Sequence, residues 1–147
     1  MTNNSSTCNF SPELFRVIDA NLNRLKEGIR VVEDIMRYQE NNKKLSSKLK
    51  QLRHKSRIEE QELLLEHRDS INDVLRPTIK SELTRTDVKS ILIANFKRAQ
   101  ESSRVLEELF KLYNLDYSEN FKYIRYELYT LEKEVIFEVI NTTSNSK

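Results

Sequence analysis

A repeated set of polar residues contains the side chains of this chain that could do chemistry. Asn21 and Arg24 recur as Asn95 and Arg98, at a constant offset of 74 residues. The same offset relates Ala20, Glu27, Arg30, Val31 and Glu33 to Ala94, Glu101, Arg104, Val105 and Glu107. Guanidinium groups bind phosphate oxygens through paired hydrogen bonds, and amide groups orient a base or a sugar. The repeated residues therefore predict one polar cleft, supplied by both repeats, that holds a phosphorylated ligand.

The same residues have a simpler, structural interpretation. Arg24 and Arg98 can pair with carboxylates on neighbouring helices, and composition alone favours neither interpretation. The repeated Glu-Arg-Glu sets are spaced by three, which allows exposed ion pairs worth about 0.3 to 0.5 kcal/mol each. If a helix, a loop or a second subunit covers that face, these residues become ligands for phosphate and magnesium instead.

A polar segment between the repeats adds acids and arginines close together. Arg68, Asp69 and Asp73 lie in a stretch rich in turn-forming residues, expected to be a loop over 68–85. Acids that hold Mg²⁺ beside arginines that neutralise phosphate are what phosphoryl transfer requires, and a loop can close as a lid. A solvated, charged linker is the alternative. Tyr126 is expected to pack between helices or to face a heterocycle.

The elements that must position these side chains are predicted to be helices over residues 12–39, 45–67, 86–113 and 118–140. Apolar residues follow steps of three and four in the first of them: Ile18, Leu22, Leu25, Ile29, Val32 and Met36. The second and fourth helices also correspond, with Arg53 matching Arg125 at an offset of 72, so the first hairpin has a loop two residues longer. Two related hairpins joined at 68–85 predict a four-helix bundle with pseudo-twofold symmetry.

Composition supports an all-α fold. The chain has 147 residues, one glycine and no tryptophan, with 33% charged and 37% hydrophobic residues. Dinucleotide-binding and phosphate-cradling loops need several glycines, so those folds are disfavoured. We expect a single domain over 11–140, between disordered polar tails at 1–10 and 141–147. A net charge of +2 argues against nucleic-acid binding, and the lack of a leader or a long apolar run predicts a cytoplasmic protein with no membrane segment.

Several ordered motifs resemble those of a known small helical family. They are Asp19-Ala20-Asn21-Leu22-Asn23-Arg24, Glu27 to Glu33, Arg68-Asp69-Ser70 with Asp73, Ala94 to Glu108, Lys111-Leu112-Tyr113, and Arg125 to Glu132. The chain is similar here to the monofunctional hydroxymethylpyrimidine phosphate kinases, which occur alone or fused ahead of thiamine-phosphate synthase. The resemblance covers residues 14–135.

The resemblance implies that the chain transfers the γ-phosphoryl group of ATP to 4-amino-5-hydroxymethyl-2-methylpyrimidine phosphate, with ATP and Mg²⁺ as cofactors. On that basis we expect phosphate clamping and catalysis from Arg24, Arg98, Arg68, Arg104 and Lys111. Substrate binding is expected from Asn21, Asn95, Arg30, Arg125 and Tyr126. Metal binding is expected from Asp69, Asp73, Glu101 and Glu27.

A homodimer is expected, and association with thiamine-phosphate synthase is a further possibility. The synthase activity itself belongs to a (β/α)₈ barrel of about 200 residues or more, too large for this chain. Two alternatives stay open. One is a helical interaction module without chemistry, and the other is a small helical enzyme in which paired arginines hold a dicarboxylate.

Overall fold

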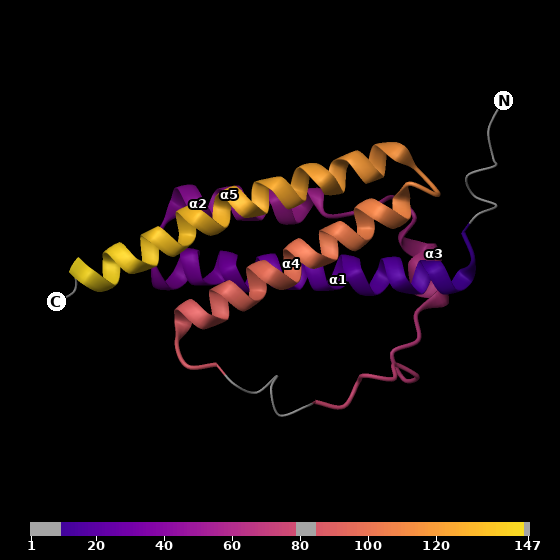
Figure 1. Ribbon diagram of the computed structural model, residues 1–147, viewed down its shortest axis with the longest axis horizontal. Helices are drawn as coiled ribbons and strands as arrows, with labels where there is room; N and C mark the ends of the chain where they lie inside the picture. Colours follow the sequence, from indigo (N-terminus) through magenta and orange to yellow (C-terminus); the bar gives the residue numbers. More distant parts are fainter. Residues whose placement is uncertain (1–9, 79–84, 146–147) are drawn as a thin grey trace.

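Two helical hairpins lie against each other in the computed structural model, which describes residues 10–78 and 85–145 (Figure 1). The elements are α1 (Pro12–Asp34), the π-helical turn η2 (Ile35–Gln39), α2 (Lys43–Lys55), α3 (Gln61–His67), α4 (Val88–Phe110) and α5 (Leu115–Asn145). The described residues contain no strand. The predicted all-α fold is therefore confirmed.

Polar side chains begin the helices as their sequence signals indicate. Ser11 accepts a hydrogen bond from the backbone N–H of Leu14 at 3.2 Å, and Pro12 follows at the first helical position. Asp87 accepts one from the N–H of Ser90 at 2.8 Å, in a reciprocal capping arrangement. These contacts satisfy N–H groups that have no partner within the helix.

The predicted second helix over 45–67 is divided into two. The chain turns at Ser56, whose hydroxyl donates to the Leu52 carbonyl at 2.8 Å, and α3 starts only at Gln61. This turn places Ile58 and Leu64 in the core beneath α1, which a straight helix would not do. Burial of these two side chains therefore prevails over helical continuity.

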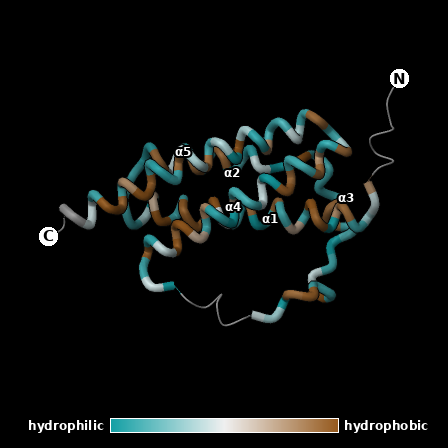
Figure 2. Tube along the Cα trace, viewed as in Figure 1, coloured by the Kyte–Doolittle hydropathy of each residue, from teal (hydrophilic) through white to brown (hydrophobic). Residues whose placement is uncertain are grey.

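The predicted apolar seams form the core. All six seam residues of α1 and η2 are at most 1% exposed. Figure 2 shows hydrophobic positions recurring along each helix between hydrophilic ones. The seams of α2 and α5 are buried as well: Leu45, Leu49, Leu52, Phe121, Ile124, Leu128, Leu131 and Val135.

The helical domain extends beyond its predicted limits. Phe10, expected in the N-terminal tail, is buried and its ring stacks on that of Tyr113 at 5.0 Å between centroids. At the other end, α5 starts at Leu115 instead of Ser118 and continues past residue 140 to Asn145. Residues 1–9, 79–84 and 146–147, which include most of the predicted N-terminal tail and part of the 68–85 connection, lie outside the described residues. Within the described ranges, no helix has a stretch long and apolar enough to cross a bilayer.

Candidate functional site

The repeated asparagines make the same bond in both halves of the molecule. The Asn21 side-chain amide donates to the Val17 carbonyl at 2.9 Å, and that of Asn95 donates to the Ile91 carbonyl at 2.8 Å. Each asparagine side chain is thereby held along its own helix, and its amide group donates a hydrogen bond within the protein. The pseudo-twofold relation inferred from the repeat thus extends to individual hydrogen bonds.

Two partly buried ion pairs are related by the same pseudo-twofold symmetry. Arg53 of α2 contacts Glu33 of α1 through Nε to Oε1 at 2.6 Å and Nη2 to Oε2 at 3.2 Å. Arg125 of α5 donates to Oε1 of Glu107 in α4 at 3.1 and 2.9 Å. The hydrogen bond to Glu33 raises the pKa of Arg53 above its usual value. These four residues join the helices of each hairpin, and Arg125, expected to bind substrate, is engaged in this way.

A large polar cleft lies between the first half of α1 and the connection that follows α3. We call it the α1 cleft. Its volume is about 780 Å³. It is lined by Glu13, Arg16, Val17, Asp19, Ala20, Asn21, Asn23 and Arg24 from α1, and by Arg68, Asp69, Ser70, Asn72, Asp73 and Val74 from the connection.

An ion pair attaches the connection to α1 and so forms the wall of the cleft. The Arg68 guanidinium donates two hydrogen bonds to the buried Asp19 carboxylate, from Nε to Oδ2 at 2.6 Å and from Nη2 to Oδ1 at 2.7 Å. The hydrogen bond to Asp19 raises the pKa of Arg68. Arg16 adds a bond from Nη2 to the backbone carbonyl of Asp69 at 3.2 Å. Because its guanidinium is paired with Asp19, Arg68 holds the connection against α1.

The acids of the connection hold its turn. Asp69 accepts bonds from the side-chain amide of Asn72 at 2.6 Å and from its backbone N–H at 3.1 Å, and these bonds lower the pKa of Asp69. Asp73 accepts one from the N–H of Leu75 at 3.0 Å. Glu27 and Glu101 do not line the cleft. No group of three or more potential metal-binding side chains occurs in the part of the chain that the structure describes.

Asp69 and Asp73 line the cleft, whereas Glu27 and Glu101 lie outside it. The expected magnesium site stays a prediction. ATP stays a prediction of the resemblance.

Arg24 differs from the other two arginines of the α1 cleft. Its side chain is exposed and makes no ion pair or hydrogen bond within residues 10–78 and 85–145. Arg16 and Arg68, in contrast, each hold a group of the connection. Arg24 is consequently the cleft arginine whose donors are available to a ligand.

The other predicted site residues do not join this cleft. Its lining omits Asn95, Arg98, Arg30, Arg104, Lys111, Arg125, Tyr126, Glu27 and Glu101. Arg30 pairs with Asp34 one turn along α1, and Arg104 and Lys111 both pair with Glu108 on the α4 side. Tyr126 is 55% exposed, with the Arg125 guanidinium over its ring. The prediction that both repeats contribute to this cleft was therefore wrong, because no residue of the second repeat lines it.

Gly28 lies where α1 crosses α4. A Cβ atom at this position would lie 2.9 Å from the Asn95 carbonyl oxygen of α4. Its lack of a side chain lets the two helices approach. Sequence reasoning missed Glu13, Arg16 and Val17, although steps of three and four from Asn21 and Arg24 continue back to them along one helical stripe.

Comparison with known proteins places the chain in a family. A family model described as the ThiD2 family matches residues 16–134. The chain belongs to the ThiD2 family. It is 41% identical over 122 residues to a thiamine-phosphate synthase of Synechocystis sp., covering 82% of this chain and 36% of that protein. A thiamine-phosphate synthase of Nostoc punctiforme is 38% identical over 124 residues, covering 84% of this chain and 35% of the relative.

The ThiD2-family chain thus spans about a third of the length of the curated relatives it matches. No solved structure matches it. The predicted kinase function is contradicted by these comparisons: the relatives are named thiamine-phosphate synthase, and the family match is to a domain within such proteins, not to a demonstrated kinase. The resemblance was right about thiamine biosynthesis and the link to thiamine-phosphate synthase. A family of monofunctional kinases is not confirmed, and the predicted kinase reaction was wrong.

Proposed function

We propose that this ThiD2-family chain acts as an enzyme domain in thiamine biosynthesis and that its α1 cleft binds a small phosphorylated aminopyrimidine. The names of the relatives support the pathway, since the matching third of each belongs to a thiamine-phosphate synthase. The proposed ligand is supported by the Arg24 guanidinium, which has no partner among the described residues and lies in a cleft of about 780 Å³. Small-molecule sites usually measure about 300 to 1,000 Å³.

The mixed charge of the cleft favours a ligand with two unlike ends. Arg24 supplies donors for phosphate oxygens, whereas Glu13 and Asp73 supply acceptors for an amino group. Val17 and Val74 offer apolar contact to the ring between these ends. A dicarboxylate fits less well, because Arg98, the second arginine of the expected pair, lies outside the cleft.

We further propose that a thiamine-phosphate synthase uses the compound bound in the α1 cleft. In the relatives, the matched segment and the remaining two thirds belong to one polypeptide. For this chain, the equivalent arrangement is association with a synthase partner. A bound compound would then be close to the enzyme that consumes it.

The two repeat-related arginines provide a matched test of the ligand site. Titration calorimetry with 4-amino-5-hydroxymethyl-2-methylpyrimidine phosphate compares the unaltered protein with Arg24→Ala and Arg98→Ala. We expect Arg24→Ala to weaken binding by about ten- to a hundredfold, the effect of losing hydrogen bonds to a charged group. Arg98→Ala removes the same charge from a helical position that is also exposed but lies outside the cleft, so the affinity of this variant should stay within about twofold. Equal losses in both variants, or none in Arg24→Ala, would contradict the proposal.

A further inference from the structure

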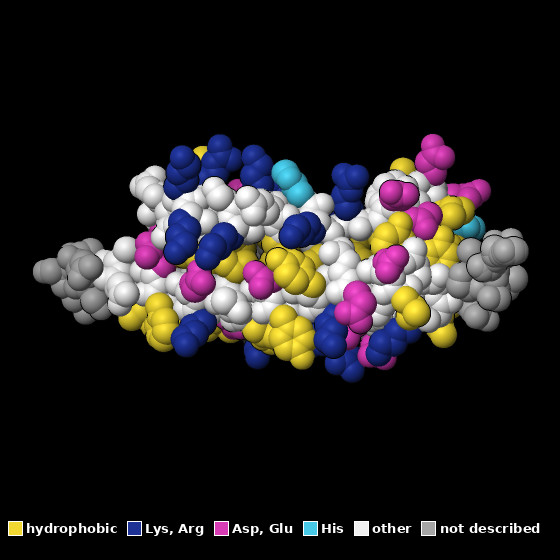
Figure 3. All heavy atoms as spheres, turned by 90° about the horizontal axis from the view of Figure 1, so that it is seen from above, with side chains coloured by type: hydrophobic (Ala, Val, Ile, Leu, Met, Phe, Trp, Pro, Cys, Tyr) yellow, Lys and Arg dark blue, Asp and Glu magenta, His cyan; other side chains and the backbone are white. Residues whose placement is uncertain are grey.

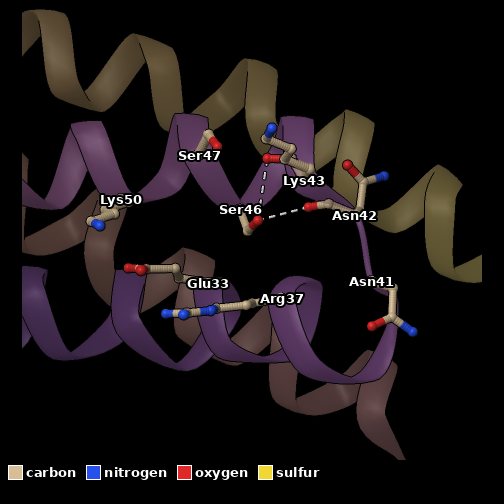
Figure 4. Close-up of a pocket in the computed structure, with 8 residues that line it drawn as sticks. All are labelled: Glu33, Arg37, Asn41, Asn42, Lys43, Ser46, Ser47 and Lys50. Carbon is tan, nitrogen blue, oxygen red and sulfur yellow. Dashed lines mark hydrogen bonds between the residues drawn. The ribbon is translucent and has the colours of Figure 1, made fainter.

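A second polar cavity lies where the first hairpin turns from α1 to α2. We call it the hairpin pocket. It has a volume of about 330 Å³. Figure 4 shows Glu33 and Arg37 reaching into it from one helix and Ser46 and Lys50 facing them from the other. Its lining consists of Glu33, Arg37, Asn41, Asn42, Lys43, Ser46, Ser47 and Lys50.

The hairpin pocket carries uncompensated positive charge. Arg37, Lys43 and Lys50 are exposed and form no ion pair within the described part of the chain. Glu33 is already paired with Arg53, a residue outside the pocket lining, through both carboxylate oxygens. Three cations around a small cavity produce a local potential that attracts anions.

Neutral donors complete the lining. Ser46 uses its hydroxyl proton within the helix, donating to the Asn42 carbonyl at 2.8 Å. Ser47 and the Asn41 amide, in contrast, have no partner in the described ranges. The pocket also adjoins the first turn of the 13-residue α2, where Asn42 caps the N–H of Leu45. Together with the three cations, these groups suit the oxygens of a phosphate.

The second hairpin repeats this arrangement only in part. Asn114 caps α5 as Asn42 caps α2, but Leu115 stands where Lys43 does and Glu119 where Ser47 does. Ser118, the counterpart of Ser46, is buried and donates to the Glu107 carbonyl at 2.8 Å. Lys111 and Lys122 match Arg37 and Lys50, so the second hairpin keeps two of the three cations and lacks the third, together with the Ser47 hydroxyl.

The two extra residues of the first hairpin loop lie beside the pocket. They coincide with the π-helical turn η2 and with Asn41, whose φ of 53° is the left-handed conformation that asparagine tolerates. Beyond the pocket, α2 contains six Lys or Arg residues and no acid in its 13 residues. Figure 3 shows a group of Lys and Arg side chains along this side of the molecule.

We propose that the hairpin pocket binds the phosphate or diphosphate group of an anionic ligand, at a site separate from the α1 cleft. Arg24 and Arg37 are 13 positions apart along one continuous helix, which corresponds to about 20 Å at 1.5 Å per residue. The two cavities share no lining residue. The proposal is therefore independent of what the α1 cleft binds.

Neighbouring lysines allow a matched experiment. Calorimetry and amide NMR shifts with sodium diphosphate, at constant ionic strength, compare the unaltered protein with Arg37→Ala, Lys50→Ala and Lys44→Ala. Lys44 adjoins Lys43 on α2 and is exposed, but does not line the pocket. We expect each pocket variant to weaken diphosphate binding by about tenfold, while Lys44→Ala changes it by about twofold or less, since long-range charge effects are screened by salt.

A second titration, with ADP, shows whether the bound anion is free diphosphate or the phosphate end of a nucleotide. Binding of ADP that equals or exceeds that of diphosphate, and depends on Arg37 and Lys50, means that the pocket takes the phosphate end of a nucleotide. Binding of diphosphate alone means that the free anion is the ligand. Both outcomes support the site.

The proposal is overturned if neither compound binds saturably at millimolar concentration, or if all three variants bind alike. Circular dichroism verifies that each exposed-residue variant is folded. Arg24→Ala should retain diphosphate binding, and Lys50→Ala should retain pyrimidine phosphate binding. A failure of one proposed site is thereby distinguished from a failure of the other.

Discussion

At the scale of single residues, equivalent side chains in the two repeats form equivalent bonds within the protein and differ only where a cavity is present. Asn21 and Asn95 bond to their own helices, and Glu33 and Glu107 each hold an arginine of the next helix. Arg24 and Arg98 have matching sequence positions, but only Arg24 lies in a cleft. A repeated residue is thus explained by packing unless its surroundings differ between the repeats.

Two tyrosines that donate hydrogen bonds to Glu60 make the stability of the fold depend on pH. Its carboxylate accepts hydrogen bonds from the hydroxyls of Tyr113 and of Tyr117, the latter at 2.8 Å. Burial, followed by the bond to Glu60, raises the pKa of Tyr113 well above its ordinary value of 10.0. Burial also raises the pKa of Tyr117. Both phenols therefore stay protonated in the folded chain at a pH where they ionise in the unfolded one.

We predict a loss of stability in alkali that Tyr113→Phe reduces. The contribution of the neutral phenol is complete below the unfolded pKa of 10.0 and is lost as the pH rises towards the folded pKa. One such group lowers the free energy of unfolding by at most about 1.4 kcal/mol per pH unit. Urea unfolding between pH 8 and about 11.5 measures this slope. Tyr126→Phe, at an exposed position, serves as the control, and an identical slope in both variants would refute the prediction.

At the scale of the elements, the crossing of α1 and α4 depends on a residue without a side chain. Gly28 contacts the α4 backbone near Asn95, and Ala99 lies beside it. In the repeat, Ser102 is the counterpart of Gly28 and is also buried. The two hairpins thus meet through small residues, which allow close approach of their backbones.

We predict that Gly28→Ala destabilises the protein. In an exposed helix this change stabilises by about 1 kcal/mol, because alanine is the better helix former. Here the new Cβ would lie 2.9 Å from a backbone oxygen, so the helices must separate. Such overpacking typically costs about 1 to 3 kcal/mol. Thermal unfolding followed by circular dichroism measures the change.

Ser102→Ala is the matched control for Gly28→Ala. It keeps the Cβ atom already present on α4 and should alter stability by less than about 1 kcal/mol. A Gly28→Ala protein as stable as the parent would show that the crossing tolerates a methyl group.

At the scale of the whole molecule, the two hairpins share one core. The largest hairpin-to-hairpin interface is that of α1 with α4, and the α1 and α4 core residues Leu25, Ile29, Phe96 and Ala99 are at most 1% exposed. Separation of the hairpins would expose this apolar surface to water. Neither hairpin therefore has a complete core of its own. The expected homodimer and the cytoplasmic location stay predictions.

We predict that the chain unfolds in one cooperative step. Tyr38 is the one tyrosine before residue 85, so tyrosine fluorescence reports chiefly on the second hairpin, whereas circular dichroism at 222 nm reports on all helices. The two urea midpoints should coincide, as in two-state unfolding of a small domain. Well-separated midpoints would mean that one hairpin is stable alone.

The sequence by itself determined the local structure and the symmetry. Seam residues such as Ile18 and Phe121 are spaced for one helical face, and Ser11 and Asp87 satisfy the first N–H groups of their helices, so these features depend only on neighbours along the chain. The constant offset between the repeats also predicted the paired hairpins. The break at Ser56 lacked such a local signal, because burial of Ile58 against another helix produces it.

Only the tertiary structure decided which polar residues share a cavity. Helical periodicity assigns Arg24 and Arg98 to matching faces, but it does not say which face the connection will cover. The ion pair between Arg68 and Asp19, 49 residues apart, brings the connection onto α1 and leaves Arg98 outside. In the first hairpin, residues of two helices line the basic hairpin pocket beside the longer loop. Both cavities depend on contacts distant in sequence, which local spacing does not encode.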